Sequence, residues 1–202
     1  MRIKTAVQAL SVLLLLPAVA AAQPTAYKVD KVHSAVGFSI RHFVSDVEGR
    51  FKDFDGTITL DPAHPADASV QFTVQAASIA TDNDDRDKHL RSPDFFDAEK
   101  FPTLTFTSTK VAPKGANAFD VTGNLTIHGV TKTVTIPATF QGSVKTPMGV
   151  RAGFSSSFKI DRKDYGVVWN RAMEGGGAML GDEVEITIRV EASQPKPPAA
   201  TK

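Results

Sequence analysis

Residues 184–191 have the sequence VEITIRVE, in which apolar side chains alternate with polar or charged ones at every position. Successive side chains of a β-strand point to opposite faces of the sheet. The pattern therefore places Val184, Ile186, Ile188 and Val190 on one buried face and leaves the residues between them in water. This clean alternation is typical of antiparallel sheets that have one buried face.

The same period of two recurs along most of the chain. It is strict over residues 70–76, and weaker versions occupy residues 36–40, 58–60, 104–106, 119–127, 134–136 and 154–160. Turn-forming pairs such as Asp55-Gly56 and His128-Gly129 separate these stretches. We predict about eight or nine strands with short connections, and thus an all-β antiparallel barrel or sandwich. An eight-stranded barrel has an interior just wide enough for packed side chains or one slender ligand.

Residues 81–100, with the sequence TDNDDRDKHLRSPDFFDAEK, do not alternate and predict one short helical insertion. Thr81 or Asp82 can cap the helix, and the acidic residues that follow suit its positive N-terminal end. Pro93 should end the helix near Ser92, because the residue before a proline disfavours helical backbone. Such a segment can cover one end of a barrel.

The two ends of the chain do not share this pattern. Residues 1–22 begin with basic Arg2 and Lys4, continue through an apolar stretch too short to span a bilayer, and end in Ala20-Ala21-Ala22. We interpret residues 1–22 as a secretory signal peptide and expect export to the periplasm. Residues 193–202 are polar and proline-rich, which predicts a disordered tail. The barrel domain is expected to occupy residues 23–192.

The composition excludes several classes of function. The 202 residues include no cysteine, so disulfides, thiolate zinc sites and a cysteine nucleophile are absent. A formal net charge of +1 argues against binding nucleic acid through bulk positive charge. The five histidines show no metal-ligand spacing, and no nucleophile elbow or phosphate-binding loop is present, so we expect neither a metal site nor an enzyme. Residue physics alone leaves two alternatives, a barrel that binds an apolar ligand and a barrel filled by its own phenylalanines.

Four segments stand out by their order and spacing: YKVDKVHSAVGFSIRH at residues 27–42, RDKHLRSPDFFD at 86–97, GNLTIHGVTK at 123–132 and FKIDRKDYG at 158–166. Together they resemble the YceI-like family of periplasmic lipid-binding proteins, and the resemblance spans about residues 27–192. It implies an extended, eight-stranded antiparallel lipocalin-like barrel around a long apolar cavity. It also implies binding of a polyisoprenoid, an isoprenoid quinone or a related long-chain amphiphilic lipid in that cavity. With the signal-peptide pattern, this leads us to expect an exported, non-enzymatic carrier of such a lipid.

No cofactor besides such a bound lipid is expected, nor a nucleic-acid partner, nor a membrane-spanning segment in the mature chain. Pairing of two chains into a homodimer stays open. Two other functions are also left open: an enzyme or redox accessory acting on the lipid, and a filled structural barrel acting through protein partners.

Alternation selects the side chains that should line the cavity. They are Phe38, Ile40, Phe72, Val74, Phe106, Leu125, Ile127, Phe154, Phe158 and Ile186. A register error of one residue would turn any strand's set outward. Polar candidates for contact with a lipid head group are His42, Arg86, Asp87, His89 and Arg91. Ordinary ion pairs and helix caps offer a structural explanation for the same polar residues.

Overall fold

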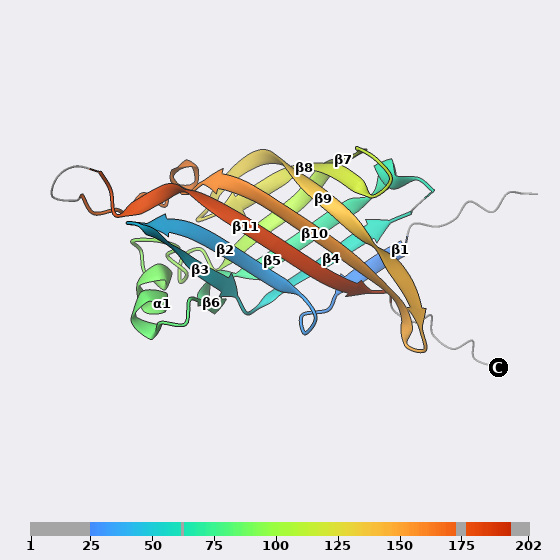
Figure 1. The fold of residues 1–202 in the computed structure, drawn as a ribbon, viewed down its shortest axis with the longest axis horizontal. Helices are drawn as coiled ribbons and strands as arrows, with labels where there is room; N and C mark the ends of the chain where they lie inside the picture. The colour runs from blue at the N-terminus through green and yellow to red at the C-terminus, as the bar shows by residue number, and fades with distance from the viewer. Residues whose placement is uncertain (1–24, 62, 173–176, 195–202) are drawn as a thin grey trace, which may run out of the picture.

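Eleven strands pair into one antiparallel sheet in the computed structural model, which describes residues 25–61, 63–172 and 177–194 (Figure 1). The predicted signal peptide lies outside the described residues, as does the predicted tail from residue 195 on. The strands are β1 (Thr25–Val29), β2 (Ala35–His42), β3 (Ser45–Phe51), β4 (Phe54–Leu60), β5 (Ser69–Gln75), β6 (Ile79–Ala80), β7 (Thr103–Pro113), β8 (Ala118–Ile127), β9 (Val130–Thr146), β10 (Gly149–Asp161) and β11 (Leu180–Ser193).

Eight of these strands close into a barrel, which confirms the predicted fold. The order of pairing is β1, β4, β5, β7, β8, β9, β10 and β11, and β11 returns to β1. That last seam is short, with Lys28 opposite Ser193 and Val29 opposite Ala192. Farther along, β11 pairs with β2 instead, and β3 and β6 continue the sheet from there. The barrel is therefore elongated, with β1 at one end and β2, β3 and β6 at the other (Figure 1).

The described residues contain more strands than the eight or nine predicted. The segment SDVEGRF of β3 offers little apolar alternation, and β6 has only two residues, so neither shows a clear pattern in the sequence. Both form because they add to existing strand edges, β3 to β2 and β6 to β3. Strand β11 also ends later than predicted, since it includes Ser193, and the Gln194 N–H donates to the Val150 carbonyl at 2.8 Å.

The predicted helix is present but shorter than the non-alternating segment. Helix α1 (Asp84–Arg91) is capped by Asn83, whose side chain accepts from the Arg86 N–H at 2.9 Å. Neither predicted cap, Thr81 or Asp82, serves this role; Asp82 takes a positive φ of 58° in the turn before the cap. The helix ends at Arg91 as expected from Pro93, and it lies beside β3 and β6 at one end of the barrel (Figure 1). No helix within the described ranges has the length and apolar character needed to cross a membrane.

Candidate functional site

The barrel interior contains two adjoining cavities. The outer cavity, next to α1, has a volume of about 260 Å³, and the inner cavity, toward β1, has about 170 Å³. The two follow one another along the barrel because five residues belong to both walls: Phe38, Phe51, Leu104, Ile127 and Ile186. Aliphatic and aromatic side chains make up most of both walls, and no Asp or Glu of the described residues lines either one.

All ten side chains selected by alternation lie on these walls. Phe38, Ile127 and Ile186 line both cavities, and Ile40 lines the outer one. The other six line the inner cavity: Phe72, Val74, Phe106, Leu125, Phe154 and Phe158. Their contact with a lipid stays a prediction.

The phenylalanine rings lie along the wall because glycines on neighbouring strands make room for them. Gly49 of β3 is paired with Phe38 of β2, and a Cβ atom at Gly49 would lie 2.3 Å from the Cζ atom of that ring. Gly56 of β4 is paired with Phe72 of β5, and a Cβ atom there would lie 2.6 Å from the ring. Each ring thus covers a position without a side chain, which keeps it out of the centre of the barrel.

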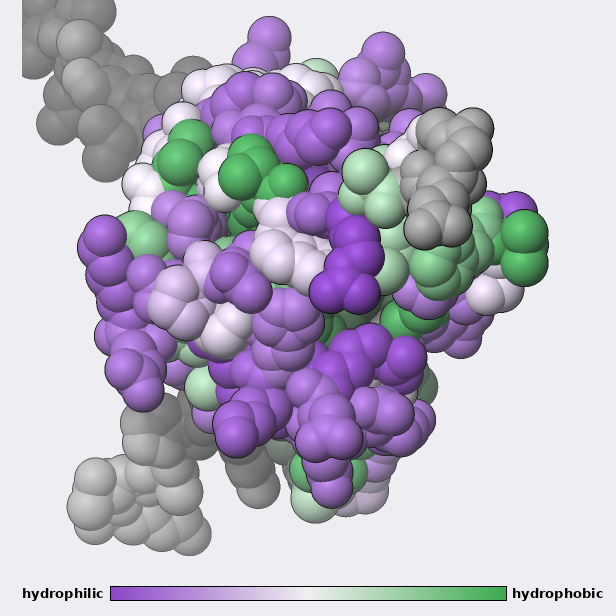
Figure 2. All heavy atoms as spheres, turned by 90° about the vertical axis from the view of Figure 1, so that its left-hand side faces the viewer, coloured by the Kyte–Doolittle hydropathy of each residue, from purple (hydrophilic) through white to green (hydrophobic). Residues whose placement is uncertain are grey.

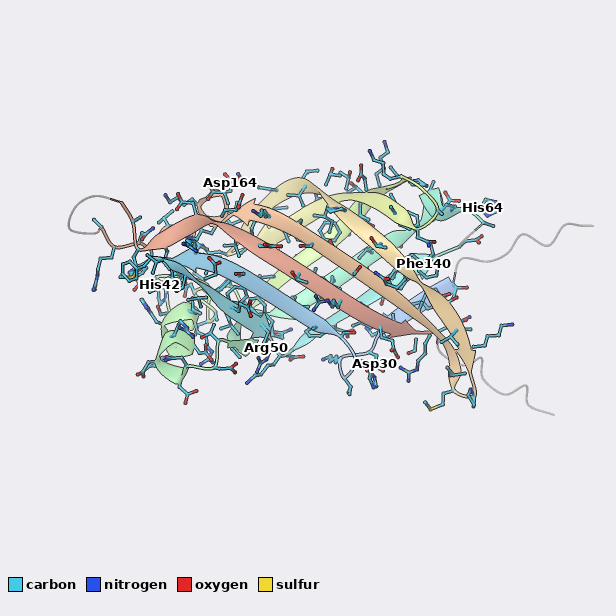
Figure 3. All side chains as sticks on the ribbon, in the orientation of Figure 1. Asp30, His42, Arg50, His64, Phe140 and Asp164 are labelled. Atoms are coloured by element: carbon cyan, nitrogen blue, oxygen red, sulfur yellow. The ribbon has the colours of Figure 1, made fainter. Side chains whose placement is uncertain are left out.

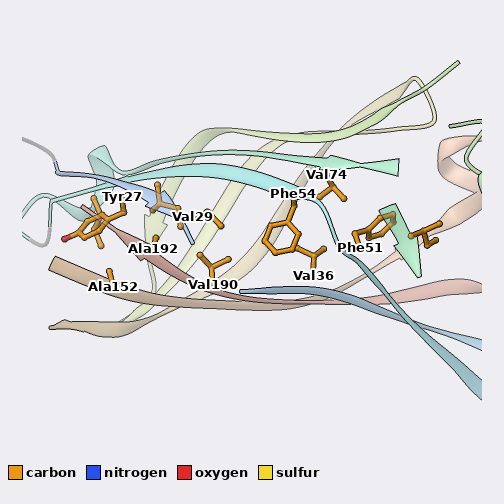
Figure 4. Packing of buried hydrophobic residues seen from close by; sticks show 12 residues of the cluster. Tyr27, Val29, Val36, Phe51, Phe54, Val74, Ala152, Val190 and Ala192 are labelled. Carbon is orange, nitrogen blue, oxygen red and sulfur yellow. The ribbon is translucent and has the colours of Figure 1, made fainter. Parts of the chain in front are cut away.

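The end of the barrel near β1, here called the closed end, is packed solid. Figure 4 shows Tyr27 and Val29 of β1 close to Ala152 of β10 and Ala192 of β11. Ala152 and Ala192 are paired across the two strands and are only 2% and 0% exposed. None of these four residues lines either cavity. These packed side chains close the end of the inner cavity that lies toward β1.

The opposite end, here called the mouth, is where the outer cavity meets the surface. His89 of α1 lines that cavity, and its side chain is 42% exposed. His42 also lines it from the last position of β2, at the far end of the molecule from His64 (Figure 3). The view onto this end shows a mainly hydrophilic surface with hydrophobic residues visible in a few separate places (Figure 2).

Helix α1 brings Arg86 to the mouth and holds it there through Thr81. The Arg86 Nε atom donates to Thr81 Oγ1 and its Nη2 to the Thr81 carbonyl, both at 2.7 Å. Its Nη1 atom makes no hydrogen bond within the described residues and remains available on the cavity wall. Arg86 is thus oriented before any ligand arrives.

Two of the predicted head-group contacts, Asp87 and Arg91, bind groups of the protein itself in the structure. The Asp87 carboxylate is buried and accepts from both the N–H and the hydroxyl of Thr81, at 2.8 and 2.6 Å. Arg91 donates to the carbonyls of Ala77 and Ile79 at 2.9 and 3.3 Å. Neither side chain lines a cavity. Both instead fix the segment before the helix, because its backbone polar groups need partners away from water.

His89 is fixed by one polar and two aromatic neighbours. Its Nε2 atom lies 2.8 Å from Asp94 Oδ2, within hydrogen-bonding distance. Its ring packs edge-on against Phe95 and Trp169, with ring centroids 5.0 Å apart in both pairs. Trp169 therefore joins the connection before β11 to the helix, and all three rings line the outer cavity.

Arg162 was missed by the sequence analysis, although it lies within the segment FKIDRKDYG. It begins the 3₁₀ turn η3 (Arg162–Tyr165), lines the outer cavity and is only 5% exposed. Its guanidinium donates to the carbonyls of Val167, Trp169 and Gly181 at 2.7 to 2.9 Å. Burial lowers the pKa of Arg162 from its ordinary value, yet an arginine side chain keeps its charge in proteins. Arg162 thus adds a cation to the wall and ties the mouth loop to β11.

Tyr165, the second missed residue, also lines the outer cavity. Its side chain is 2% exposed, and burial raises the pKa of its hydroxyl. The hydroxyl makes no hydrogen bond within the part of the chain that the structure describes. A hydroxyl on a cavity wall that has no protein partner can donate to a polar atom of a ligand. Nothing in a single sequence distinguishes this tyrosine from one that only packs in a core.

One cluster outside the barrel has side chains of the metal-binding types. Asp30, His33 and Glu191 place their ligand atoms within 4.8 Å of one another. Arg151 already occupies the space between the two carboxylates, donating to Asp30 at 2.7 Å and to Glu191 at 2.5 Å. Its guanidinium neutralises much of the charge that a cation would need, so the cluster functions as an ion-pair network beside the seam of β1 and β11.

Comparisons with known proteins agree with this geometry. A family model described as the YceI-like domain matches residues 27–192. Protein YceI of Salmonella arizonae is 45% identical over 174 residues, which cover 84% of this chain and 87% of that protein.

Solved structures share the fold. The crystal structure of Burkholderia cenocepacia BcnA matches with a TM-score of 0.73 at 30% identity, covering 82% of this chain and 99% of BcnA. A structure described as a polyisoprenoid binding domain from Saccharophagus degradans matches with a TM-score of 0.63 at 17% identity, covering 85% of this chain and 99% of that one.

Proposed function

The chain belongs to the YceI-like domain family, and we propose that it is a non-enzymatic carrier of a long-chain isoprenoid lipid. The hydrocarbon tail lies in the inner and outer cavities, and the polar head group lies at the mouth. The observation that carries this proposal is the pair of adjoining apolar cavities, sealed at the closed end and accessible at the mouth. The Saccharophagus degradans domain, described as polyisoprenoid-binding, has the same fold and supports the ligand class.

Burial of the tail supplies enough free energy for such a role. Each buried methylene contributes about 0.8 kcal/mol, so a chain of about 20 carbons gains roughly 16 kcal/mol before any costs. Association and ordering remove much of this gain, and micromolar or tighter binding remains. The cavities also argue against the filled barrel, because the phenylalanine rings lie on the wall and leave the interior hollow.

The mouth favours a head group that carries acceptor oxygens. His42, Arg86 and Tyr165 all lie on the wall of the outer cavity. The His42 ring, the Nη1 atom of Arg86 and the Tyr165 hydroxyl make no hydrogen bond inside the described residues. The wall carries no carboxylate among these residues, whereas two arginines contribute positive charge. A cationic head group would lose its water without gaining an opposite charge, which is costly. A phosphate, carbonyl or hydroxyl oxygen would find donors instead.

We place this carrier in the periplasm, on the basis of the signal-peptide pattern of residues 1–22. A long prenyl chain exposes a large apolar surface to water, and a closed barrel removes that surface during passage through an aqueous compartment. The enzyme alternative differs in one observable, since it requires chemical turnover of the lipid that His42 or His89 would assist.

The proposal is tested by a cavity-blocking variant and its matched control. Ile186→Trp places a large ring at the junction of the two cavities, whereas Glu185→Trp places the same ring on the outer face of the same strand. We expect the wild-type protein and Glu185→Trp to yield stoichiometric prenyl lipid on organic extraction and mass spectrometry. We expect Ile186→Trp to yield at least tenfold less while retaining a β-rich circular dichroism spectrum.

Equal lipid recovery from both variants would place the ligand outside the barrel. Absence of bound lipid from the wild type, before and after incubation with a prenyl alcohol and a prenyl phosphate, would refute the carrier. Conversion of the added lipid, lost in His42→Ala or His89→Ala, would favour the enzyme instead.

A further inference from the structure

The inner cavity ends against a cluster of three aromatic rings, here called the floor. The Phe154 ring lies 5.5 Å from the ring of Phe140 and 6.2 Å from the ring of Tyr27, measured between centroids. Phe154 lines the inner cavity, whereas Phe140 and Tyr27 line neither cavity. Phe154 is therefore the aromatic ring that a ligand tail meets, and the other two support it from behind.

Directly behind the floor, the closed end is packed with buried side chains. Leu60 and Val29 are buried there, together with the paired Ala152 and Ala192. These four residues belong to one packed cluster that also contains Tyr27. Close packing of this kind resists insertion, because additional atoms force side chains and backbone to shift. A tail that reaches Phe154 therefore meets packed side chains behind the ring.

We propose that Phe154 sets the length of the isoprenoid chain that the barrel accepts in full, an inference that rests on the proposed carrier function. Each isoprene unit adds affinity only while it leaves water for the cavity. A unit beyond the floor has to remain at the mouth in contact with water, or fold back within a narrow space. Affinity should therefore rise with chain length and then stop rising.

The depth of the barrel indicates where that limit falls. Leu180 lines the outer cavity and Val190 the inner one, and they lie ten residues apart on β11. At about 3.4 Å per residue and a typical strand tilt of about 40°, this separation corresponds to roughly 26 Å along the barrel axis. An extended chain advances about 1.2 Å per bond, so an isoprene unit with four main-chain bonds spans about 5 Å. The cavities then hold about five units.

A bulge in the neighbouring strand places a second aromatic ring beside Phe154. Gly142 of β9 is paired with Gly153 and Phe140 with Phe154, so Gln141 is the extra residue and the bulge lies in β9. Bulges re-aim side chains of the bulged strand, and here Phe140 lies opposite Phe154 as part of the floor. Phe154→Ala removes the ring and leaves the space beside Phe140 and Tyr27 open to about one further unit.

The experiment measures affinity for a series of prenyl alcohols of two to eight isoprene units by displacement of a fluorescent prenyl probe. In the wild type we expect affinity to rise with each unit and reach a plateau. In Phe154→Ala we expect the plateau to begin one isoprene unit later. This variant should bind the chain of that length roughly tenfold more tightly than the wild type does, and shorter chains with the wild-type affinity. Phe154→Leu, which keeps the core more nearly filled, should shift the plateau in the same direction.

Phe158→Ala is the matched control, because Phe158 lines the inner cavity on the same strand but is not part of the floor. It should lower affinity without moving the plateau. An unmoved plateau in both Phe154 variants, the same shift in Phe158→Ala, or affinity that rises throughout the wild-type series would overturn the role of Phe154 while leaving the carrier intact. Failure of the wild type to bind any prenyl alcohol would overturn the carrier itself.

Discussion

The closed end and the mouth half of the barrel are built from the same alternating strands, yet one is solid and the other hollow. Near β1, where eight strands close the ring, alanines and branched aliphatic residues pack to almost complete burial. Toward the mouth, β11 pairs with β2 in place of β1, and helix α1 lies beside β3 and β6 at that end of the barrel. Alternation thus determines which side chains face inward. Strand arrangement and side-chain size determine whether those side chains contact one another and fill the interior or leave a cavity.

The largest expected difference between the two regions is in the cost of truncating an inward-facing side chain. Leu60→Ala removes atoms from the packed closed end and should lower the free energy of unfolding by about 2–5 kcal/mol. Ile186→Ala removes atoms that already face a cavity, so fewer contacts are lost and we expect about 1–2 kcal/mol. Urea denaturation of both variants without lipid measures the difference.

The same urea denaturation can be repeated with a bound prenyl lipid. It should raise the stability of the Leu60→Ala protein as much as that of the wild type, because ligand binding stabilises whichever fold binds it equally. Equal costs for the two truncations without lipid would contradict the division into a solid and a hollow region.

The second prediction concerns the glycines that keep the interior open. Gly49→Ala should push the Phe38 ring toward the barrel axis, where it obstructs the junction of the two cavities. We expect lipid affinity to fall about tenfold, and stability to change by less than about 1 kcal/mol because the ring has free space to enter. Calorimetric titration with a prenyl alcohol measures the effect.

A rescue variant separates this effect from general damage. Gly49→Ala combined with Phe38→Leu should recover most of the affinity, since the smaller side chain no longer obstructs the junction. Gly115→Ala, at a turn position where an added Cβ meets nothing within 4 Å, is the control. Unchanged affinity in Gly49→Ala would mean that the ring does not enter the cavity.

These glycines also show where sequence reasoning stops. A period of two is local. It predicted an antiparallel barrel or sandwich, the family resemblance implied the barrel, and all ten side chains selected by the alternation line the interior. Whether the interior is hollow depends on which residues of neighbouring strands are paired, such as Phe38 with Gly49. The sequence of one strand alone does not reveal this pairing. The filled and hollow barrels therefore remained equal alternatives until the pairing of β2 with β3 was known.

The polar residues named as head-group candidates differ in where the fold places them. His42, Arg86 and His89 reach the cavity wall, but Asp87 and Arg91 bind backbone groups of residues 77–81. The sequence gives the type and position of a polar residue on a short helix, but it does not give that residue's hydrogen-bond partner. Arg162 and Tyr165 lie in a segment that contributes to the family resemblance, but this strand-to-turn segment does not alternate, and only the fold shows that both residues line the cavity.

The third and smallest expected effect concerns how each end responds to acid. At the closed end, Arg151 and then His33 hold the pKa of Asp30 well below its usual value, and the same Arg151 also pairs with Glu191. At the mouth, Arg162 donates chiefly to backbone carbonyls, which do not titrate. Acid should therefore weaken the seam of β1 and β11 before it weakens the mouth.

The sign follows from the lowered pKa of Asp30. A carboxylate that loses its proton more easily in the folded state stabilises the fold above its unfolded pKa of about 4, and this contribution declines as the pH falls below that value. The wild-type unfolding temperature should fall more between pH 5 and pH 3 than that of Asp30→Asn, which has no charge to lose. Asp46→Asn, which removes an exposed partner of Arg41, should follow the wild type. Hydrogen exchange at pH 3 should show early loss of protection in β1, while β11 residues next to Arg162 stay protected. If the unfolding temperatures of the wild type and Asp30→Asn fall in parallel with pH, the ion-pair network does not keep the barrel closed.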